Sequence, residues 1–295
     1  ASFNRAVSLD AEDSLAWRNR GRVLAQLGNV EEALASFDRA VSLNAEDASA
    51  WTEYGSTLHQ LGRVEEALKA FDSVLALAPQ NAVALTNRGT TLYQLNCVEE
   101  ALESFDRALA LDSELELAWQ GRAFALLDLG RMDEAIASFN RSLALPPSTN
   151  VTHVGGAFSV SALNSMAWAL FTEAPHEKLP IAEDWAQRAV EQAPEDGSAR
   201  HTLACILGAQ GRWDQALKEA AVFLSDGHLL DSHLDLVIDF FIDAVASGHA
   251  AEVEKVIQSA GAEDALEPLL VAIRRLSGEQ VDIAREILEI SNDVI

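Results

Sequence analysis

The amino-acid sequence predicts an all-α fold in which antiparallel helix pairs stack into a solenoid. Helix-favouring Ala and Leu recur throughout, while the chain of 295 residues holds only 7 Pro, 16 Gly and 2 Tyr. A fixed set of residues returns every 34 positions. Each 34-residue unit holds two apolar stretches with i, i+3, i+4 spacing, separated by a glycine turn. One such hairpin cannot bury its apolar faces alone, so neighbouring units must stack.

The repeated positions form vertical columns when the units are aligned. One column holds large residues, Trp17, Trp51, Leu85 and Trp119, and the next holds small ones, Gly21, Gly55, Gly89 and Ala123. The second stretch of each unit carries Ala33, Ala67, Ala101 and Ala135, then Phe37, Phe71, Phe105 and Phe139. The turn columns hold Gly28, Gly62, Asn96 and Gly130. The pattern W-x3-G…A-x3-F-x2-A resembles the tetratricopeptide repeat over residues 14–149. This resemblance implies a right-handed superhelix whose first helices line a concave groove.

The domain organisation follows from where the period holds and where it fails. Residues 14–149 form four regular repeats, 14–47, 48–81, 82–115 and 116–149. Residues 1–13 match a second helix, so we expect a truncated repeat whose first helix precedes Ala1 and whose open edge contacts another chain. Residues 150–162, rich in Gly and β-branched residues, are expected to form an inserted loop. Residues 163–224 are expected to hold two degenerate repeats.

The remaining segment, 225–295, lacks the repeat pattern but keeps helical punctuation. Gly248 and Gly278 each end one apolar periodic stretch and precede another. We expect helices near 230–246, 250–259, 263–276 and 281–291. These degenerate pairs would form a cap at the end of the solenoid, because terminal repeats need a modified outer face. The segment loosely resembles the tails of bacterial repeat proteins, which suggests a prokaryotic source.

Charge and composition limit the classes of partner and the cellular location that we expect. The net charge of −25 disfavours phosphate backbones and anionic lipid, so we expect neither nucleic acid nor membrane as a partner. Acidic pairs such as Glu31-Glu32 stand at the start of second helices, where they complement the helix dipole. The two cysteines lie far apart and suit a reducing compartment, so a cytoplasmic location is expected.

No motif in the chain predicts chemistry of its own. Phosphate-binding, dinucleotide-binding, zinc-protease and serine-hydrolase motifs are missing, so we expect no catalytic residues, no cofactor and no enzyme activity. Asp231, Asp235, Asp239 and Asp243 recur every four residues on one expected helix. Because they span about 18 Å at 1.5 Å per residue, they cannot converge on one ion, and we interpret them as a solvated face with no metal site.

Charged columns and the cysteines have expected structural roles. Arg20, Arg88 and Arg122 share one column, and Asp38, Asp72 and Asp106 share another. We expect Arg–Asp bridges between paired helices, with ligand contacts as the alternative. Cys97 falls in a turn and is expected to be exposed, whereas Cys205 falls on a first helix and could face the groove.

The candidate binding residues are those that the resemblance places in the groove. They are Arg18, Asn19, Arg22, Thr52, Glu53, Ser56, His59, Thr86, Asn87, Thr90, Tyr93, Gln120, Phe124, Leu127, Trp168 and Phe171. Amides and hydroxyls among them can bond a peptide backbone. Family members that clamp a terminal carboxylate use Lys and Asn, but Glu53 would repel that group. Sugar-transferase relatives carry an asparagine ladder, which Asn19 and Asn87 fit and Gly121 breaks.

The groove turns apolar at Phe124, Leu127, Trp168 and Phe171. These side chains are either anchors for a partner or the seat of the loop at 150–160, folded back over them. The sequence therefore predicts a non-catalytic module that binds a peptide segment or a partner domain. Two alternatives stay open: the regulatory arm of a larger signalling ATPase or protease, and a self-assembling scaffold, a homo-oligomer joined through the truncated N-terminal repeat.

Overall fold

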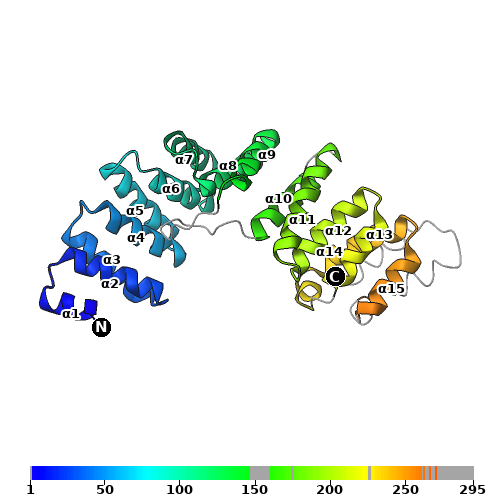
Figure 1. Ribbon diagram of the computed structural model, residues 1–295, viewed down its shortest axis with the longest axis horizontal. Helices are drawn as coiled ribbons and strands as arrows, with labels where there is room; N and C mark the ends of the chain where they lie inside the picture. Colours follow the sequence, from blue (N-terminus) through cyan, green and yellow to red (C-terminus); the bar gives the residue numbers. More distant parts are fainter. Residues whose placement is uncertain are drawn as a thin grey trace. The chain divides into compact units, whose positions relative to one another are not determined.

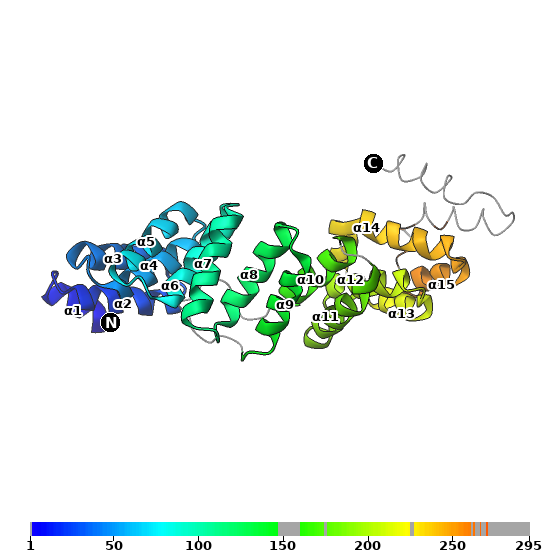
Figure 2. The same ribbon diagram turned by 90° about the horizontal axis from the view of Figure 1, so that it is seen from above.

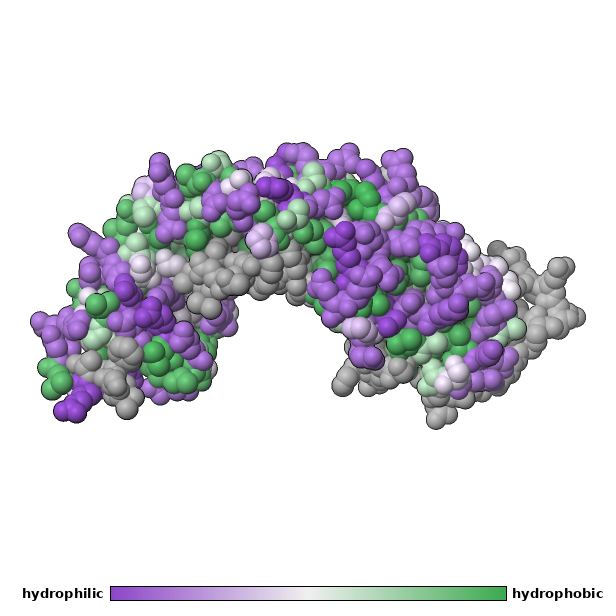
Figure 3. Space-filling model, in the orientation of Figure 1, coloured by the Kyte–Doolittle hydropathy of each residue, from purple (hydrophilic) through white to green (hydrophobic). Residues whose placement is uncertain are grey.

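The computed structural model describes residues 2–146, 160–173, 176–224, 227–260 and the single positions 262, 266 and 270. Throughout this part of the chain the regular structure is helical. The chain divides into two compact units, residues 1–157 and 158–295. Hydrophilic side chains cover much of the visible surface of each unit, with apolar patches between them (Figure 3).

The first unit begins with α1 (Ser2–Leu9) and continues as four helix pairs (Figure 1). The pairs are α2 (Ser14–Gln26) with α3 (Val30–Leu43), α4 (Ala48–Gln60) with α5 (Val64–Leu77), α6 (Ala82–Gln94) with α7 (Val98–Leu111), and α8 (Glu116–Asp128) with α9 (Met132–Leu143). The first helices α2, α4, α6 and α8 pack along one another, and each second helix packs against the first helix of the next pair. The structure is therefore the expected all-α helical repeat array.

Short-range chemistry sets the limits of these helices. Asp13, Asp47 and Asn81 each accept hydrogen bonds from backbone N–H groups of the first turn that follows. The turn within each pair needs a left-handed residue, which Gly28, Gly62 and Gly130 supply at φ between 69° and 78°. Asn96 takes the same place in the third pair at φ 60°, a conformation that Asn tolerates better than most residues.

The core of the first unit is a row of phenylalanines against small residues. Phe37, Phe71, Phe105 and Phe139 are at most 1% exposed. A Cβ atom added to Gly89 would lie 2.7 Å from Cε1 of Phe105. The column of small residues therefore leaves the space that the phenylalanine rings occupy. At the N-terminal edge Leu9 and Leu27 stay exposed. Self-association through that edge remains a prediction.

The arginine column links successive pairs, which corrects one expectation. Arg88 on α6 donates to Asp72 on α5 at 2.8 Å and to Ser104 on α7 at 2.7 Å. Arg122 on α8 repeats this geometry with Asp106 at 2.7 Å and Ser138 at 2.6 Å. Arg–Asp bridges therefore form at Arg88 and Arg122, but they join a first helix to the second helix of the preceding pair. The helix's own partner supplies the serine. Arg20 instead forms an ion pair with Glu32 on α3, the partner of its own helix, at 3.1 Å.

The described residues of the second unit form three further pairs (Figures 1 and 2). They are α10 (Val160–Glu173) with α11 (Leu179–Gln192), α12 (Gly197–Ala209) with α13 (Trp213–Phe223), and α14 (Gly227–Ala246) with α15 (Ala250–Ala260). A single 3-10 turn, η1 (His176–Lys178), precedes α11. In the stacking, α10 packs on α12, α12 on α14, and α13 on α15.

The structure corrects the end of the loop expected at 150–162, and some of the other expectations for this region fall on residues that it does not describe. Helix α10 starts at Val160, so residues 160–162 belong to a helix rather than to the expected loop, because Ala162 and Leu163 are buried in its packing. The rest of the expected loop and the helices expected near 263–276 and 281–291 fall largely outside the described residues. Among the helices that are described, none combines the length and the apolar character needed to cross a bilayer.

Candidate partner-binding site

The predicted groove residues can be compared by their position in each first helix. Residues at the same position in successive first helices form a column. The ninth residue of each first helix is Arg22, Ser56, Thr90 or Phe124 in the first unit, and Trp168 or Cys205 in the second. The twelfth is Ala25, His59, Tyr93 or Leu127, and then Phe171 or Gly208. Since equivalent helices pack in the same way, the side chains of a column point to the same face of their unit.

At the N-terminal end of the first unit, the predicted groove arginines already contact other side chains of the protein. Arg18 forms an ion pair with Asp47 at 2.7 Å, and Arg22 donates to the side-chain oxygen of Asn19 at 2.9 Å. Burial raises the pKa of Glu53, although Arg22 and Arg18 act against that shift. Positively and negatively charged side chains therefore interact with one another at this end of the first unit.

The middle of the first unit contributes less open surface than the sequence predicted. Thr52 is 8% exposed, Ser56 6%, and Thr86 and Asn87 are fully buried. The hydroxyl of Thr86 donates to the Ala82 carbonyl at 2.9 Å, so it is satisfied by its own helix. In this structure these four side chains are not accessible to a partner.

The other predicted residues of the first unit are half-buried. The hydroxyl of Thr90 on α6 donates to the Thr86 carbonyl at 3.1 Å. Gln120 lies on α8, the next first helix. Burial lowers the pKa of His59. Burial and a hydrogen bond with Asp128 raise the pKa of Tyr93.

Two predicted apolar anchors of the first unit take part in its packing. Phe124 meets the buried Phe139 edge to face, with ring centroids 6.4 Å apart. Leu127 packs against the core cluster that includes Leu126 and Ala135. Both side chains keep some exposure, but their neighbours already cover much of them.

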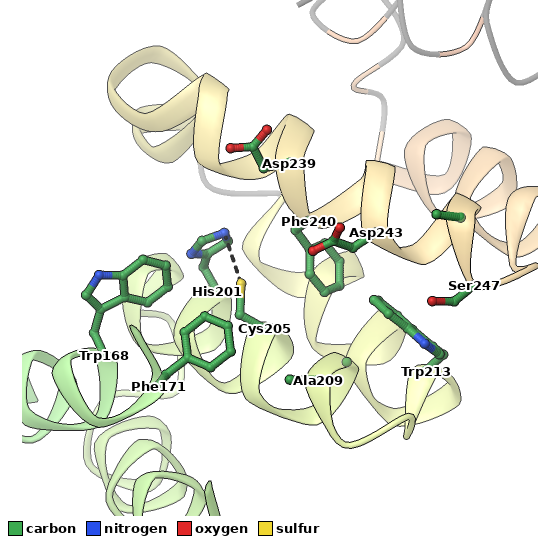
Figure 4. A pocket seen from close by; sticks show the side chains of 12 residues that line it. Trp168, Phe171, His201, Cys205, Ala209, Trp213, Asp239, Phe240, Asp243 and Ser247 are labelled. Atoms are coloured by element: carbon green, nitrogen blue, oxygen red, sulfur yellow. Dashed lines mark hydrogen bonds between the residues drawn. The ribbon is translucent and has the colours of Figure 1, made fainter. Parts of the chain in front are cut away.

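The second unit holds a cavity of about 440 Å³, which we call the aromatic cavity. It is lined by Trp168 and Phe171 from α10, His201, Cys205, Gly208 and Ala209 from α12, Trp213 from α13, Asp239, Phe240, Asp243 and Ala246 from α14, and Ser247. Its volume falls in the range typical of ligand sites. Figure 4 shows Trp168 and Phe171 on the α10 side and the two carboxylates on α14.

A network of rings fixes the walls of the aromatic cavity. Trp168 lies 5.4 Å from Phe171 and 5.8 Å from His201, measured between ring centroids. On the other side, Trp213 lies 5.8 Å from Phe240. Trp213 and Phe240 are buried, whereas Trp168 and Phe171 stay half-exposed at the rim.

Gly208 opens the floor of the aromatic cavity. A Cβ atom at this position would lie 2.8 Å from Cη2 and Cζ3 of Trp213. The absence of a Cβ atom at Gly208 therefore lets the indole of Trp213, from the start of α13, pack closely against α12.

Among the described lining residues of the aromatic cavity, Cys205 and His201 form a pair that resembles a catalytic arrangement. Sγ of Cys205 lies 3.5 Å from Nε2 of His201. Burial, together with the carboxylates of Asp243 and Asp239, raises the pKa of Cys205 to about 12. The thiol therefore stays protonated near neutral pH and is a poor nucleophile. Within the described residues, no three His, Cys, Asp or Glu side chains are grouped to hold a metal ion.

Comparison with known proteins identifies the family. The tetratricopeptide repeat family model matches residues 1–45, 21–82 and 86–149. This chain is a tetratricopeptide repeat protein. No curated protein matches it in sequence.

Several solved structures resemble this chain in fold at low sequence identity. The type IV pilus biogenesis factor PilW is 21% identical, with a TM-score of 0.63 over 76% of this chain and 98% of its own. Pseudomonas aeruginosa PilF is 20% identical, with a TM-score of 0.61 over 78% and 98%. YrrB, described as a TPR protein with an unusual peptide-binding site, is 22% identical, with a TM-score of 0.51 over 68% and 97%. At these identities the likeness concerns the fold alone.

Reasoning from the sequence found part of the aromatic cavity of this tetratricopeptide repeat protein. The sequence predicts Trp168 and Phe171 as groove residues, and it leaves open whether Cys205 faces the groove. His201, Trp213 and Phe240 were missed. Trp213 stands where the second helices α3, α5, α7 and α9 of the first unit begin with Val or Met, a difference that could have drawn attention to it.

The cysteines and acidic residues need two further corrections. Cys97 is not simply exposed: it precedes α7 and is half-buried against the cluster around Phe105. Asp239 and Asp243 are exposed, as expected of a solvated face, but they also border the aromatic cavity. The side chains of Asp231 and Asp235 lie outside the described residues.

Proposed function

We propose that this chain is a non-catalytic interaction module that binds an extended peptide segment of a partner protein at the first helices of its second unit, with the aromatic cavity as the main anchoring point. The family is one of protein–protein interaction modules, which supports the general class. The observation that carries the specific proposal is the half-exposed pair Trp168 and Phe171 at the rim of a preformed cavity. Exposed aromatic side chains in a pocket are typical anchors of protein interfaces.

Other features of the surface agree with a protein partner. The net charge of −25 opposes binding to nucleic acid or to anionic lipid. The resemblance in fold to YrrB, itself described as having a peptide-binding site, supports a peptide as the ligand class. A thiol with a raised pKa beside His201 gives the aromatic cavity no activated nucleophile, which favours binding over catalysis.

The test is a comparison of two tryptophans in the same unit. Peptides are selected from a random displayed library on the folded chain, and their affinities are then measured for Trp168→Ala and Trp185→Ala. Trp168 is half-exposed, so we expect its removal to weaken binding by about tenfold or more with a small change in melting temperature. Trp185 is fully buried in α11, so its removal should cost about 3–5 kcal/mol of folding stability.

Two results would contradict the proposal. The first is that no specific peptide is selected on the unmodified chain. The second is that Trp168→Ala binds the selected peptides as well as the unmodified chain does. A large loss of stability in Trp168→Ala would instead mean that the indole is a core element rather than an anchor.

A further inference from the structure

We propose that the aromatic cavity receives the positively charged side chain of a lysine or arginine from the partner peptide. This inference rests on the proposed function and names the residue type that the cavity selects. It is carried by the juxtaposition of four aromatic rings with two carboxylates in one cavity.

The charge at the aromatic cavity is of one sign. Asp239 and Asp243 stand one turn apart on α14, and both are exposed. The described lining of the cavity contains no Lys or Arg, and no ion pair to either carboxylate is found among the described residues. Of the lining residues, His201 alone could carry a positive charge, and it is buried among rings. A cation brought by a partner would meet two carboxylates without displacing a cation of the protein.

The aromatic rings favour the same kind of occupant. Trp168, Phe171, Trp213 and Phe240 come from three different helices and surround the space beneath the carboxylates (Figure 4). Ring faces attract ammonium and guanidinium groups, and the attraction grows where water is excluded. A Lys or Arg side chain also carries an aliphatic stem that can lie against the exposed parts of Trp168 and Phe171.

Other occupants fit the aromatic cavity less well. Burial raises the pKa of Asp243, and the neighbouring Asp239 raises it further, so the ionised form of Asp243 is held there at some cost. An apolar side chain would increase that burial without compensation, and an acidic one would add a third negative charge. A bound cation stabilises the ionised carboxylates and removes the conflict.

The experiment uses four pools of short synthetic peptides with blocked ends. The pools share degenerate flanks and differ only at a fixed central residue, which is lysine, arginine, norleucine or glutamate. Norleucine is the control for lysine, because it keeps the aliphatic stem and lacks the charge. Binding is followed on the full chain through the indole N–H signals of Trp168 and Trp213, each assigned with its Trp→Phe variant.

We expect the lysine and arginine pools to bind about tenfold or more tightly than the norleucine pool, and the glutamate pool to bind weakest. The double variant Asp239→Asn, Asp243→Asn should reduce the difference in affinity between the lysine and norleucine pools, leaving only the part that the aromatic rings supply. Glu191→Gln with Glu195→Gln removes the same charge from exposed positions of this unit that do not line the cavity, and should preserve the difference. Added salt should weaken the lysine pool far more than the norleucine pool.

The outcomes separate this inference from the function on which it rests. Equal or tighter binding of the norleucine pool would overturn the cation inference while leaving peptide binding in place. If no pool shifts either indole signal, both proposals fail. If blocked lysine alone binds as tightly as the lysine pool, the aromatic cavity is a site for small organic cations, and the commitment to a peptide is wrong.

Discussion

Gly121 on α8 is a position where adding one methyl group should destabilise the first unit. In Gly121→Ala the new Cβ would lie 2.6 Å from Cε1 and 2.9 Å from Cε2 of Phe105, and nearer still to Cζ. Carbon atoms prefer separations of about 3.5–4.0 Å, so the overlap is close to 1 Å. Phe105 is fully buried and also abuts Gly89, so its ring has little room to withdraw.

The expected magnitude follows from two opposing effects. Overpacking a core costs about 1–3 kcal/mol, and this overlap places Gly121→Ala near the upper value. Replacing a mid-helix Gly by Ala returns about 1 kcal/mol through helix propensity. We therefore expect a net loss of about 2 kcal/mol, or a fall in melting temperature of about 4–8 °C.

The assay is urea unfolding, fitted with a repeat-based model because a helical array need not unfold in two states. In the Phe105→Leu background the ring edge is gone, so Gly121→Ala should become neutral or stabilising, with a coupling energy of about 1–3 kcal/mol. Gly62→Ala is the control: no atom lies within 4 Å, and its cost comes only from φ +71°, so Phe105→Leu should leave that cost unchanged. The packing argument is refuted if Gly121→Ala is as stable as the unmodified chain, or if its cost persists without the ring.

Two further predictions concern the arginine column and the thiol of the aromatic cavity. Arg122→Met removes contacts to second helices on both sides and should lower the free energy of unfolding by about 1–2 kcal/mol. The control Arg131→Met loses only an exposed ion pair with Glu134 and should change the free energy of unfolding by less than about 0.5 kcal/mol. Equal losses for the two variants in urea unfolding would contradict the linking role of Arg122. Because the pKa of Cys205 is raised to about 12, its alkylation by iodoacetamide in a Cys97→Ser background should be slow at neutral pH and accelerate steadily as the pH rises. Asp243→Asn lowers that pKa and should increase the rate, measured by mass spectrometry, and an unchanged rate would show that the carboxylate does not act on the thiol.

Much of the candidate site was open to prediction because its columns repeat. Trp168 and Phe171 share helix positions with Phe124 and Leu127, so one alignment found all four. Packing then separated them, because Phe124 and Leu127 lie against the core while Trp168 and Phe171 border a cavity. From the sequence alone, Gly121 is only a break in an asparagine ladder. The structure explains it by the ring of Phe105 from the preceding pair.

The sequence by itself determined the family, the all-α repeat class and the helix pairs of the regular repeats, because caps, turn glycines and apolar spacing act over a few residues. It could not determine which groove positions stay open, because burial depends on neighbours from other repeats: Thr86 and Asn87 share columns with half-exposed residues and yet are fully enclosed. Nor could it assemble the aromatic cavity, whose walls come from α10, α12, α13 and α14. Only the stacking of these helices brings Trp168 and Asp243 to one space, and stacking is the non-local part of the fold.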